Sequence, residues 1–419
     1  MEKEGAASDP HKMWDQRASL RPPPYEGAMR PMLEGISRGD PLVDELPDAM
    51  ISPCSRHKNP FSISAIPQSP EPPWVDWEMV QRGQELWKQH IGRAFLGLTA
   101  ALLQGFTIAR FAEVLNHAGY AQSPYTSLKR YSSTAYYISD WFRYPLNDPQ
   151  SIARQGIYTV RCMHGFARRR SKSLFLQERG EGIALSQYDL GEVQLGFSAV
   201  CLSIMEVEMG MTPFSAAELE AMVHTWRLIG WHLGIEDEFN VCRSSEHLAQ
   251  CLEDYMIWTP QRLRTCREAT HVLQLAAVSG FGKHLGLGIH YFKGFIAALQ
   301  NMRGIKVRYS NIEALPGMDA FVRFRFTIVG KSDSINWLLG RFIFSVRDLM
   351  RNRPQLCEQY QRNWAPGIAA FNDNIIWQVV SLASRMRLAF QHPRVQAAVA
   401  LLLLAVVFRL KILRRRLIR

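Results

Sequence analysis

From Trp77 onward, apolar residues recur at the three- and four-residue spacing of amphipathic helices, and this pattern limits the fold more than any other feature of the chain. The pattern is clearest after Ser215. Ser215 and Glu218 have the Ser-x-x-Glu spacing of a capping box, and Gly234 is the kind of residue that ends a helix. The stripe between them consists of Leu219, Met222, Val223, Trp226, Ile229 and Leu233.

The rest of this region has the same texture. Residues 77–115 predict two helices that meet near Gly105, and residues 121–171 predict two more. Residues 321–329 alternate as a strand or an edge loop would, and the chain shows no internal repeat and no regular succession of strands and helices. We therefore expect an all-α protein with one large helical domain at residues 76–390. Its further helices are predicted at residues 247–258, 262–278, 290–302 and 374–390.

The first 75 residues differ from this domain in composition. Residues 1–73 hold 13 of the 22 prolines of the chain. Proline removes a backbone donor and disfavours the interiors of helices and sheets. Residues 1–75 are therefore predicted to form an irregular N-terminal arm, and their composition suits both a disordered leader and a segment that partly packs on the domain.

Residues 391–419 predict a membrane anchor with a basic tail. Residues 395–408 are apolar except for Gln396, and the stretch extends to Leu413 if Arg409 and Lys411 snorkel. Its 19 residues would span about 28 Å as a helix, close to the ~30 Å of a hydrocarbon core. The alternative is a helix on the membrane surface, but no polar face precedes Arg409. We expect a single-pass C-terminal transmembrane helix in the endoplasmic reticulum, with the mitochondrial outer membrane as the alternative.

The net charge of +11 belongs largely to this tail. Residues 391–419 contain seven Lys/Arg and no acid, and without them the net charge falls to +4. A basic cluster beside an apolar run is typical of the cytoplasmic side of a membrane. We therefore expect the helical domain to face the cytoplasm, with a membrane as partner and no nucleic acid.

Several common site motifs are missing. Seven cysteines without a CxxC pair indicate buried free thiols rather than a disulfide or zinc framework. The glycine-rich residues 280–288 lack P-loop spacing, and no HExxH occurs. Glu268 and His271 have the Glu-x-x-His spacing of one half of a di-iron site, which leaves a non-haem iron enzyme as one hypothesis.

His164 is the histidine with the most informative surroundings. On a helix, Ile157, Val160 and His164 share one side with Ala167, which is the pattern of an ordinary core histidine or of a metal ligand. Four arginines stand near it in the sequence, and such a run also suits a solvated face. A buried neutral imidazole with guanidinium groups nearby suits a haem site, where the imidazole binds iron and the arginines pair with propionates. The arginines are Arg161, Arg168, Arg169 and Arg170.

The preceding predicted helix adds Arg130 and Thr134, which share a face at i,i+4 spacing. Together, Arg130-Tyr-Ser-Ser-Thr134 and Val160-Arg-Cys-Met-His164 resemble the motifs of the family of rubber oxygenases (latex clearing proteins) and endoplasmic-reticulum-bound mpaB-type oxygenases. The interval from Thr134 to His164 is 30 residues, and later blocks such as Leu185–Leu190 also look like the family. The similarity covers roughly residues 90–300.

The resemblance implies a helical fold with a globin-like core and haem b, with His164 as the proximal iron ligand. It places Arg130 and Thr134 in the haem pocket as catalytic and cofactor-binding residues, with Arg168 as a further cofactor-binding residue. The implied reaction is O₂-dependent cleavage of a C=C bond in an isoprenoid or other lipophilic substrate. Latex clearing proteins carry a lysine just before the threonine, and Ser133 stands here instead. A second hypothesis is a non-catalytic, tail-anchored membrane adaptor that keeps the helical fold.

Overall fold

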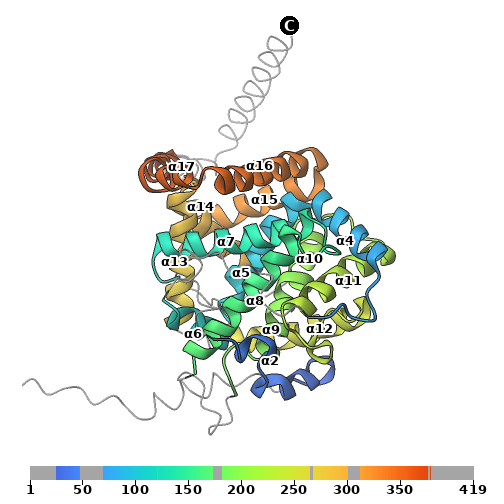
Figure 1. The fold of residues 1–419 in the computed structure, drawn as a ribbon. Helices are drawn as coiled ribbons and strands as arrows, with labels where there is room; N and C mark the ends of the chain where they lie inside the picture. The colour runs from blue at the N-terminus through green and yellow to red at the C-terminus, as the bar shows by residue number, and fades with distance from the viewer. Residues whose placement is uncertain are drawn as a thin grey trace, which may run out of the picture.

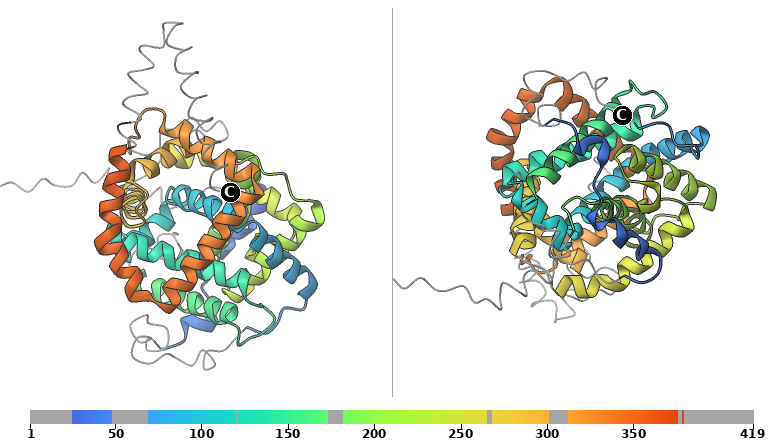
Figure 2. Two further views of the ribbon diagram at one scale, coloured as in Figure 1. Left: turned by 90° about the horizontal axis from the view of Figure 1, so that it is seen from above. Right: turned by 60° about the horizontal axis from the view of Figure 1, so that its bottom comes forward.

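The computed structural model describes residues 25–47, 69–119, 121–172, 182–264, 268–300, 312–375 and 378. Within these ranges, helices are the only regular elements, so the all-α prediction is confirmed. They surround one large hydrophobic core, with α5 at its centre (Figures 1 and 2). The long helices are α4 (Trp77–Gln89), α5 (Ile91–Gly105), α6 (Ala109–His117), α7 (Pro124–Arg143), α8 (Ile152–Arg170), α9 (Gln187–Leu195), α11 (Ala216–His232), α12 (Ser245–Arg264), α13 (Glu268–His284), α14 (Ile289–Gln300), α15 (Met318–Lys331) and α16 (Asp333–Asn352).

The predicted anchor at residues 391–419 lies outside the described residues, as does most of the helix predicted at residues 374–390. Elsewhere the helices follow the sequence pattern closely. Both helices predicted in residues 121–171 are present as α7 and α8. The capping box of α11 is also confirmed, because the Ser215 side chain accepts from the Glu218 N–H while Glu218 bonds back to Ser215.

Two predictions from the pattern were wrong, and two helices were missed. Residues 77–115 form three helices rather than two. Residues 321–329 form part of helix α15, because the buried side chains Val322, Phe326 and Val329 recur at helical spacing despite the local alternation. Helices α16 and α17 (Pro354–Gln359) were not predicted.

The centre of the core is aromatic. Trp87 of α4 stacks on Phe142 of α7 with ring centroids 4.4 Å apart, and Trp226 of α11 meets the edge of Trp87 at 5.7 Å. Phe197 stacks on the other side of Trp226 at 6.4 Å. Such contacts add to the burial energy of large rings, so α4, α7 and α11 are fixed relative to one another.

Two described segments are apolar enough to cross a membrane. Both are apolar because they pack in the hydrophobic core. One is the continuous helix Gln187–Glu208, with 67% of its apolar window buried. It comprises α9, the π-helical segments η6 (Gly196–Val200) and η7 (Ile204–Glu208), and α10 (Cys201–Ser203) between them. The other is the pair α5 and α6, which bends by 90°. Most residues of α5 are buried, so it is a core helix of the domain.

Part of the Pro-rich arm belongs to the folded molecule. Residues 25–47 contain the short 3-10 helices η1 (Gly27–Met29) and η2 (Pro31–Ser37) and one turn of helix, α2 (Pro41–Asp44). Tyr25 and Met29 are buried in the main core. In Figure 1 this segment, in dark blue, lies at the end of the molecule opposite α16 and α17.

The arm holds helix α8 through buried charges. Asp40 is buried and accepts from Arg161 of α8, with Nε–Oδ2 and Nη2–Oδ1 distances of 2.6 and 2.7 Å. One turn beyond His164, Arg168 pairs with Asp44. The chain approaches closely enough that a Cβ at Gly165 of α8 would lie 2.8 Å from Val43. Charge pairing and close packing thus fix α8 against the arm.

We expect Asp40→Asn to lower the free energy of unfolding by about 3–5 kcal/mol, because it leaves the buried Arg161 charge without its partner. Chemical denaturation of the two proteins measures the difference. Glu238→Gln is the matched control, since Glu238 pairs with Arg38 at the exposed surface and its loss should cost at most about 1 kcal/mol. Equal losses in the two variants would contradict a structural role for the buried pair.

Candidate functional site

Helix α8 carries the central residue of the predicted site. Ser151 caps its first turn by accepting from the Arg154 N–H, and three arginines in its last turn complement the negative end of the helix dipole. Between these ends, Arg154, Arg161 and Arg168 are buried against the rest of the molecule. His164 lies at the border of that buried face and is half-buried.

His164 is poised as a neutral imidazole. Its pKa is lowered to about 3, first by burial and then by the positive charges of Arg168 and Arg130. Its Nδ1 atom is buried and has no hydrogen-bond partner among the described residues. A neutral, uncommitted imidazole keeps a lone pair for a metal ion at physiological pH. Buried nitrogens of His232, His271 and His290 also lack a partner in the described chain, and His164 differs from them in its position near Arg130 and Arg168.

Arg130 and Thr134 lie on α7, which packs against α8. Arg130 is exposed, yet desolvation lowers its pKa. Within the described part of the chain, no ion pair or side-chain hydrogen bond satisfies the Arg130 guanidinium. Since its charge also acts on His164, Arg130 is a cation near the imidazole that is free to meet an anion.

The Thr134 hydroxyl donates to the Arg130 carbonyl oxygen at 3.3 Å. Thr134 is half-buried, and its neighbour Ser133 is exposed and donates to the Lys129 carbonyl oxygen at 2.9 Å. Both hydroxyls therefore bond within their own helix. The structure brings Arg130 near His164 as the sequence predicted, and it places Thr134 one turn further along the same helix.

Arg168 has a different setting from the predicted one. Its Nε and Nη2 atoms donate to the Leu185 carbonyl oxygen at 2.9 and 2.7 Å, and Nη1 pairs with Asp44. Arg161 is engaged in the same way with Asp40 and with Ser69. These arginines hold the arm and the start of α9 against α8. Although both arginines are close to His164 in the sequence, their guanidinium groups bind other parts of the protein and are not free to bind a ligand.

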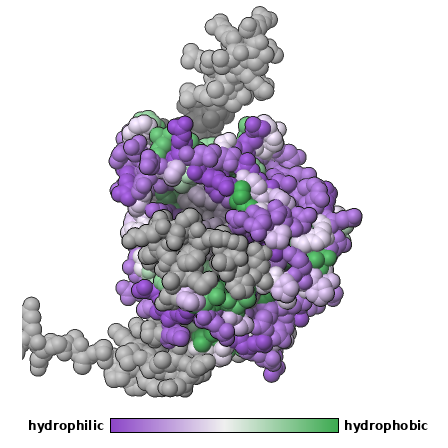
Figure 3. All heavy atoms as spheres, viewed as in Figure 1, coloured by the Kyte–Doolittle hydropathy of each residue, from purple (hydrophilic) through white to green (hydrophobic). Residues whose placement is uncertain are grey.

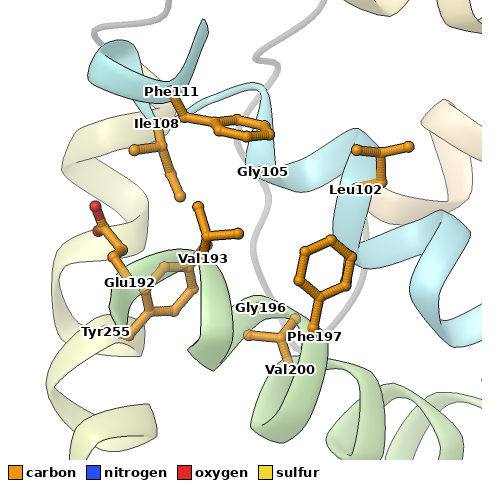
Figure 4. Close-up of a pocket in the computed structure, with 11 residues that line it drawn as sticks. Leu102, Gly105, Ile108, Phe111, Glu192, Val193, Gly196, Phe197, Val200 and Tyr255 are labelled. Atoms are coloured by element: carbon orange, nitrogen blue, oxygen red, sulfur yellow. The ribbon is translucent and has the colours of Figure 1, made fainter. Parts of the chain in front are cut away.

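A pocket with an empty volume of about 410 Å³, including space open to solvent, lies between α5, α9, η6 and α12 (Figure 4). Leu102 and Phe197 face it from one side, and Ile108 and Val193 from the other. Tyr255 also lines it. Such a lining suits an apolar ligand.

The single carboxylate in this lining is already neutralised. Glu192 accepts from Arg262 at 2.6 Å and from the Tyr25 hydroxyl at 2.9 Å. The pocket therefore keeps its apolar character despite the glutamate. Gly196, at the start of the π-helical segment η6, is also part of the wall, and π-helical turns often occur at functional sites.

Sequence reasoning missed this pocket, because its residues come from three separate parts of the chain. Two local signals were present. Ser186 and Asp189 form a capping box that starts the helix behind the pocket, and their Ser-x-x-Asp spacing is readable in the sequence. Phe197-Ser198 follows Leu185–Leu190 in the chain and lies within the residues whose sequence resembles the family. Neither signal shows that Tyr255 lies opposite.

Residues 87–301 match the catalytic domain of the family described as ER-bound oxygenase mpaB/B'/Rubber oxygenase. The match contains Arg130, Thr134, His164 and every residue that lines the pocket. No curated protein and no solved structure matched the chain.

His232 is fully buried, and we expect it to make stability depend on pH. The pKa of His232 is lowered to about 2 by burial and by the charges of Arg154 and Arg161. Glu71 lies 3.7 Å from its Nε2 atom, but burial outweighs this attraction, so the contact is not an ion pair. The folded protein therefore excludes a proton that the unfolded chain binds below about pH 6.5.

We expect the free energy of unfolding to fall as the pH is lowered from about 7 to about 5, with His232 contributing up to about 1.4 kcal/mol per pH unit. Denaturation at several pH values measures this slope, and His232→Leu should make it shallower. Tyr158→Phe is the control, because it removes the 3.2 Å contact with His232 Nδ1 but keeps the imidazole. It should lower stability without changing the slope. A slope that His232→Leu leaves unchanged would refute this account.

Proposed function

Because this chain belongs to the family of ER-bound mpaB/B' and rubber oxygenases, with the catalytic domain at residues 87–301, we propose that it is a haem-dependent oxygenase. His164 would be the proximal ligand of haem b. The unpartnered Nδ1 of a half-buried imidazole with a pKa of about 3 is the observation that carries this assignment. When bound, haem would supply the means of activating O₂, which no amino-acid side chain provides.

The positive charge near His164 is complementary to the negative charge of a haem group. Haem carries two propionates, and Arg130 is a guanidinium near His164 without an ion pair in the described part of the chain. Pairing with a propionate would compensate its desolvation. We therefore assign cofactor binding to Arg130 first, with Thr134 beside it on α7. Arg168 contributes indirectly, since it fixes α8 and its charge keeps His164 neutral.

The described residues do not favour the alternative of a non-haem iron site at Glu268 and His271. Glu268 and His271 both lie on α13, but no group of three or more His, Cys, Asp or Glu that could hold a metal is found in the described ranges. Haem needs a single protein ligand, because the porphyrin provides the other four nitrogens. The unpartnered Nδ1 of His164 and the guanidinium of nearby Arg130, which is unpaired in the described chain, therefore favour haem.

The substrate proposed is lipophilic, and cleavage of a C=C bond in an isoprenoid chain is the proposed reaction. The apolar pocket lined by Leu102, Phe197 and Tyr255 supports this substrate class. We further propose that residues 391–419 anchor the protein in a membrane, most simply that of the endoplasmic reticulum, with the domain in the cytoplasm. An anchor would hold the pocket near the phase in which such a substrate concentrates.

His164→Ala should abolish stoichiometric haem binding and with it the Soret band of the purified protein. His117→Ala is the matched control, because His117 is exposed at the end of α6 and should leave the spectrum unchanged. Absorption spectroscopy and pigment analysis are the measurements. A folded wild-type protein without haem would exclude the oxygenase proposal and favour the membrane adaptor.

Arg130→Ala should weaken haem binding about 10- to 100-fold, equivalent to the roughly 1.5–3 kcal/mol of a charge-assisted bond. Titration of the haem-free protein with haem measures the affinity. Lys129→Ala removes an exposed positive charge from the adjacent position and should have little effect. Equal affinities for the two variants would show that Arg130 does not bind a propionate.

A further inference from the structure

Exposed apolar side chains are concentrated in one part of the molecule. Among the described residues, 16 large hydrophobic side chains are exposed, and 11 of them lie between Phe321 and Ile375. They belong to α15, to α16 and to the helical segment 354–375. In Figure 1, α16 and α17 form the upper end of the molecule, and hydrophobic residues interrupt the hydrophilic surface there in Figure 3.

Helix α16 is amphipathic with an apolar stripe on its outer side. Its inner side is defined by the buried residues Asn336 and Gly340, which face α5 and its neighbours. Leu338, Phe342 and Leu349 lie on the opposite side at helical spacing, with exposures of 59%, 66% and 43%. A helix of a soluble domain normally turns such a stripe inward.

The two neighbouring segments repeat this arrangement. In 354–375, Ala365 and Ala369 face the core, while Trp364, Ile368 and Phe371 form an exposed stripe that continues to Ile375. On α15, Phe321 and Phe324 are exposed on the side away from the buried Val322 and Phe326. We call the exposed apolar residues between Phe321 and Ile375 the α15–α17 face.

The charges around this face leave a positive surplus. All five acids of residues 318–375 bond to other groups of the protein. Arg341 stacks over Trp337 at 5.2 Å, and neither it nor Arg353 makes an ion pair within the described chain. The five acids are Asp319, Asp333, Asp348, Glu358 and Asp373.

We propose that the α15–α17 face docks in the plane of an anionic lipid bilayer. Its apolar side chains would enter the boundary between headgroups and acyl chains, and its unpaired arginines would meet lipid phosphates. Tryptophan and phenylalanine beside arginine are the residues that favour this boundary. Apolar stripes on three separate helices suit a continuous fluid phase, whereas a peptide partner would need a groove.

The length of the remaining chain supports this orientation. Only residues 376–394 separate Ile375 from the start of the apolar run at Val395. These 19 residues reach about 28 Å as a helix and about 65 Å fully extended. A membrane span beginning at Val395 would therefore keep Ile375, at the end of this face, within about 65 Å of the bilayer surface. The docking itself depends neither on the haem proposal nor on the substrate.

The test uses the full-length chain with Phe342→Cys, labelled at that thiol with an environment-sensitive fluorophore and reconstituted in phosphatidylcholine–phosphatidylserine vesicles. The control is Ile257→Cys on α12, another apolar side chain that is 68% exposed but lies outside the face. The described native cysteines are buried, and the unsubstituted chain labelled in parallel gives the background.

We expect lipids with nitroxide-labelled acyl chains to quench the label at position 342 several-fold more than the label at position 257. Aqueous iodide should show the reverse order. Phe324→Cys on α15 gives an independent second position with the same expectation. Equal exposure of the labels at 342 and 257 to iodide would overturn the proposal.

Protein rather than lipid at this face would give a different result. The label at 342 would then be protected from iodide without being quenched by the nitroxide lipids, which also overturns the proposal. Dilution of the protein in excess lipid would identify the occupant, because protection by a second copy would be lost and protection by residues 376–419 would persist. Replacing phosphatidylserine with phosphatidylcholine should reduce nitroxide quenching at 342, because the arginines lose their anionic partners.

Discussion

The buried ion pair between Asp40 and Arg161 is the contact on which the arrangement around His164 depends. It joins two segments about 120 residues apart, and neither charge can be left alone in the interior without a large desolvation cost. Because Arg161 lies one turn before His164 on α8, the pair fixes the rotation of that helix. Asp44 and Arg168 repeat the contact one turn after His164. The helix turns before and after His164 are thus both held in place by ion pairs with the arm.

The arginines of α8 and the arginine of α7 near His164 therefore have different roles. The guanidinium groups of Arg161 and Arg168 are used for the fold, and the positive charge of Arg168 also lowers the pKa of His164. Arg130 has no such partner in the described chain and so remains available for chemistry. A neutral imidazole and one free cation are a small set of groups, and haem is the kind of ligand that can use both. The apolar pocket near Phe197 is joined to α7 through Trp226, which stacks on Phe197 and makes a T-shaped contact with Phe142.

The two ends of the molecule have opposite surfaces. At one end, the arm covers α8 and α9 and buries its own apolar residues, including Met29 and Met32. At the other end, α15, α16 and the segment 354–375 turn apolar stripes outward. The domain therefore has a closed end and an end suited to contact with a lipid surface. A lipophilic substrate and an apolar docking face would place the protein at the same physical boundary.

The sequence alone determined the helical class, the capping boxes and the spacing of Arg130, Thr134 and His164, because these depend on residues close together in the chain. It also indicated the family, since the order of short motifs survives without knowledge of the fold. Only the tertiary structure decided which arginines are free, because Asp40, Asp44 and Leu185 come from distant segments that the sequence near His164 does not reveal. The same holds for the α15–α17 face. An amphipathic stripe is readable in a sequence, but whether it turns toward the core or outward depends on what else packs against the helix.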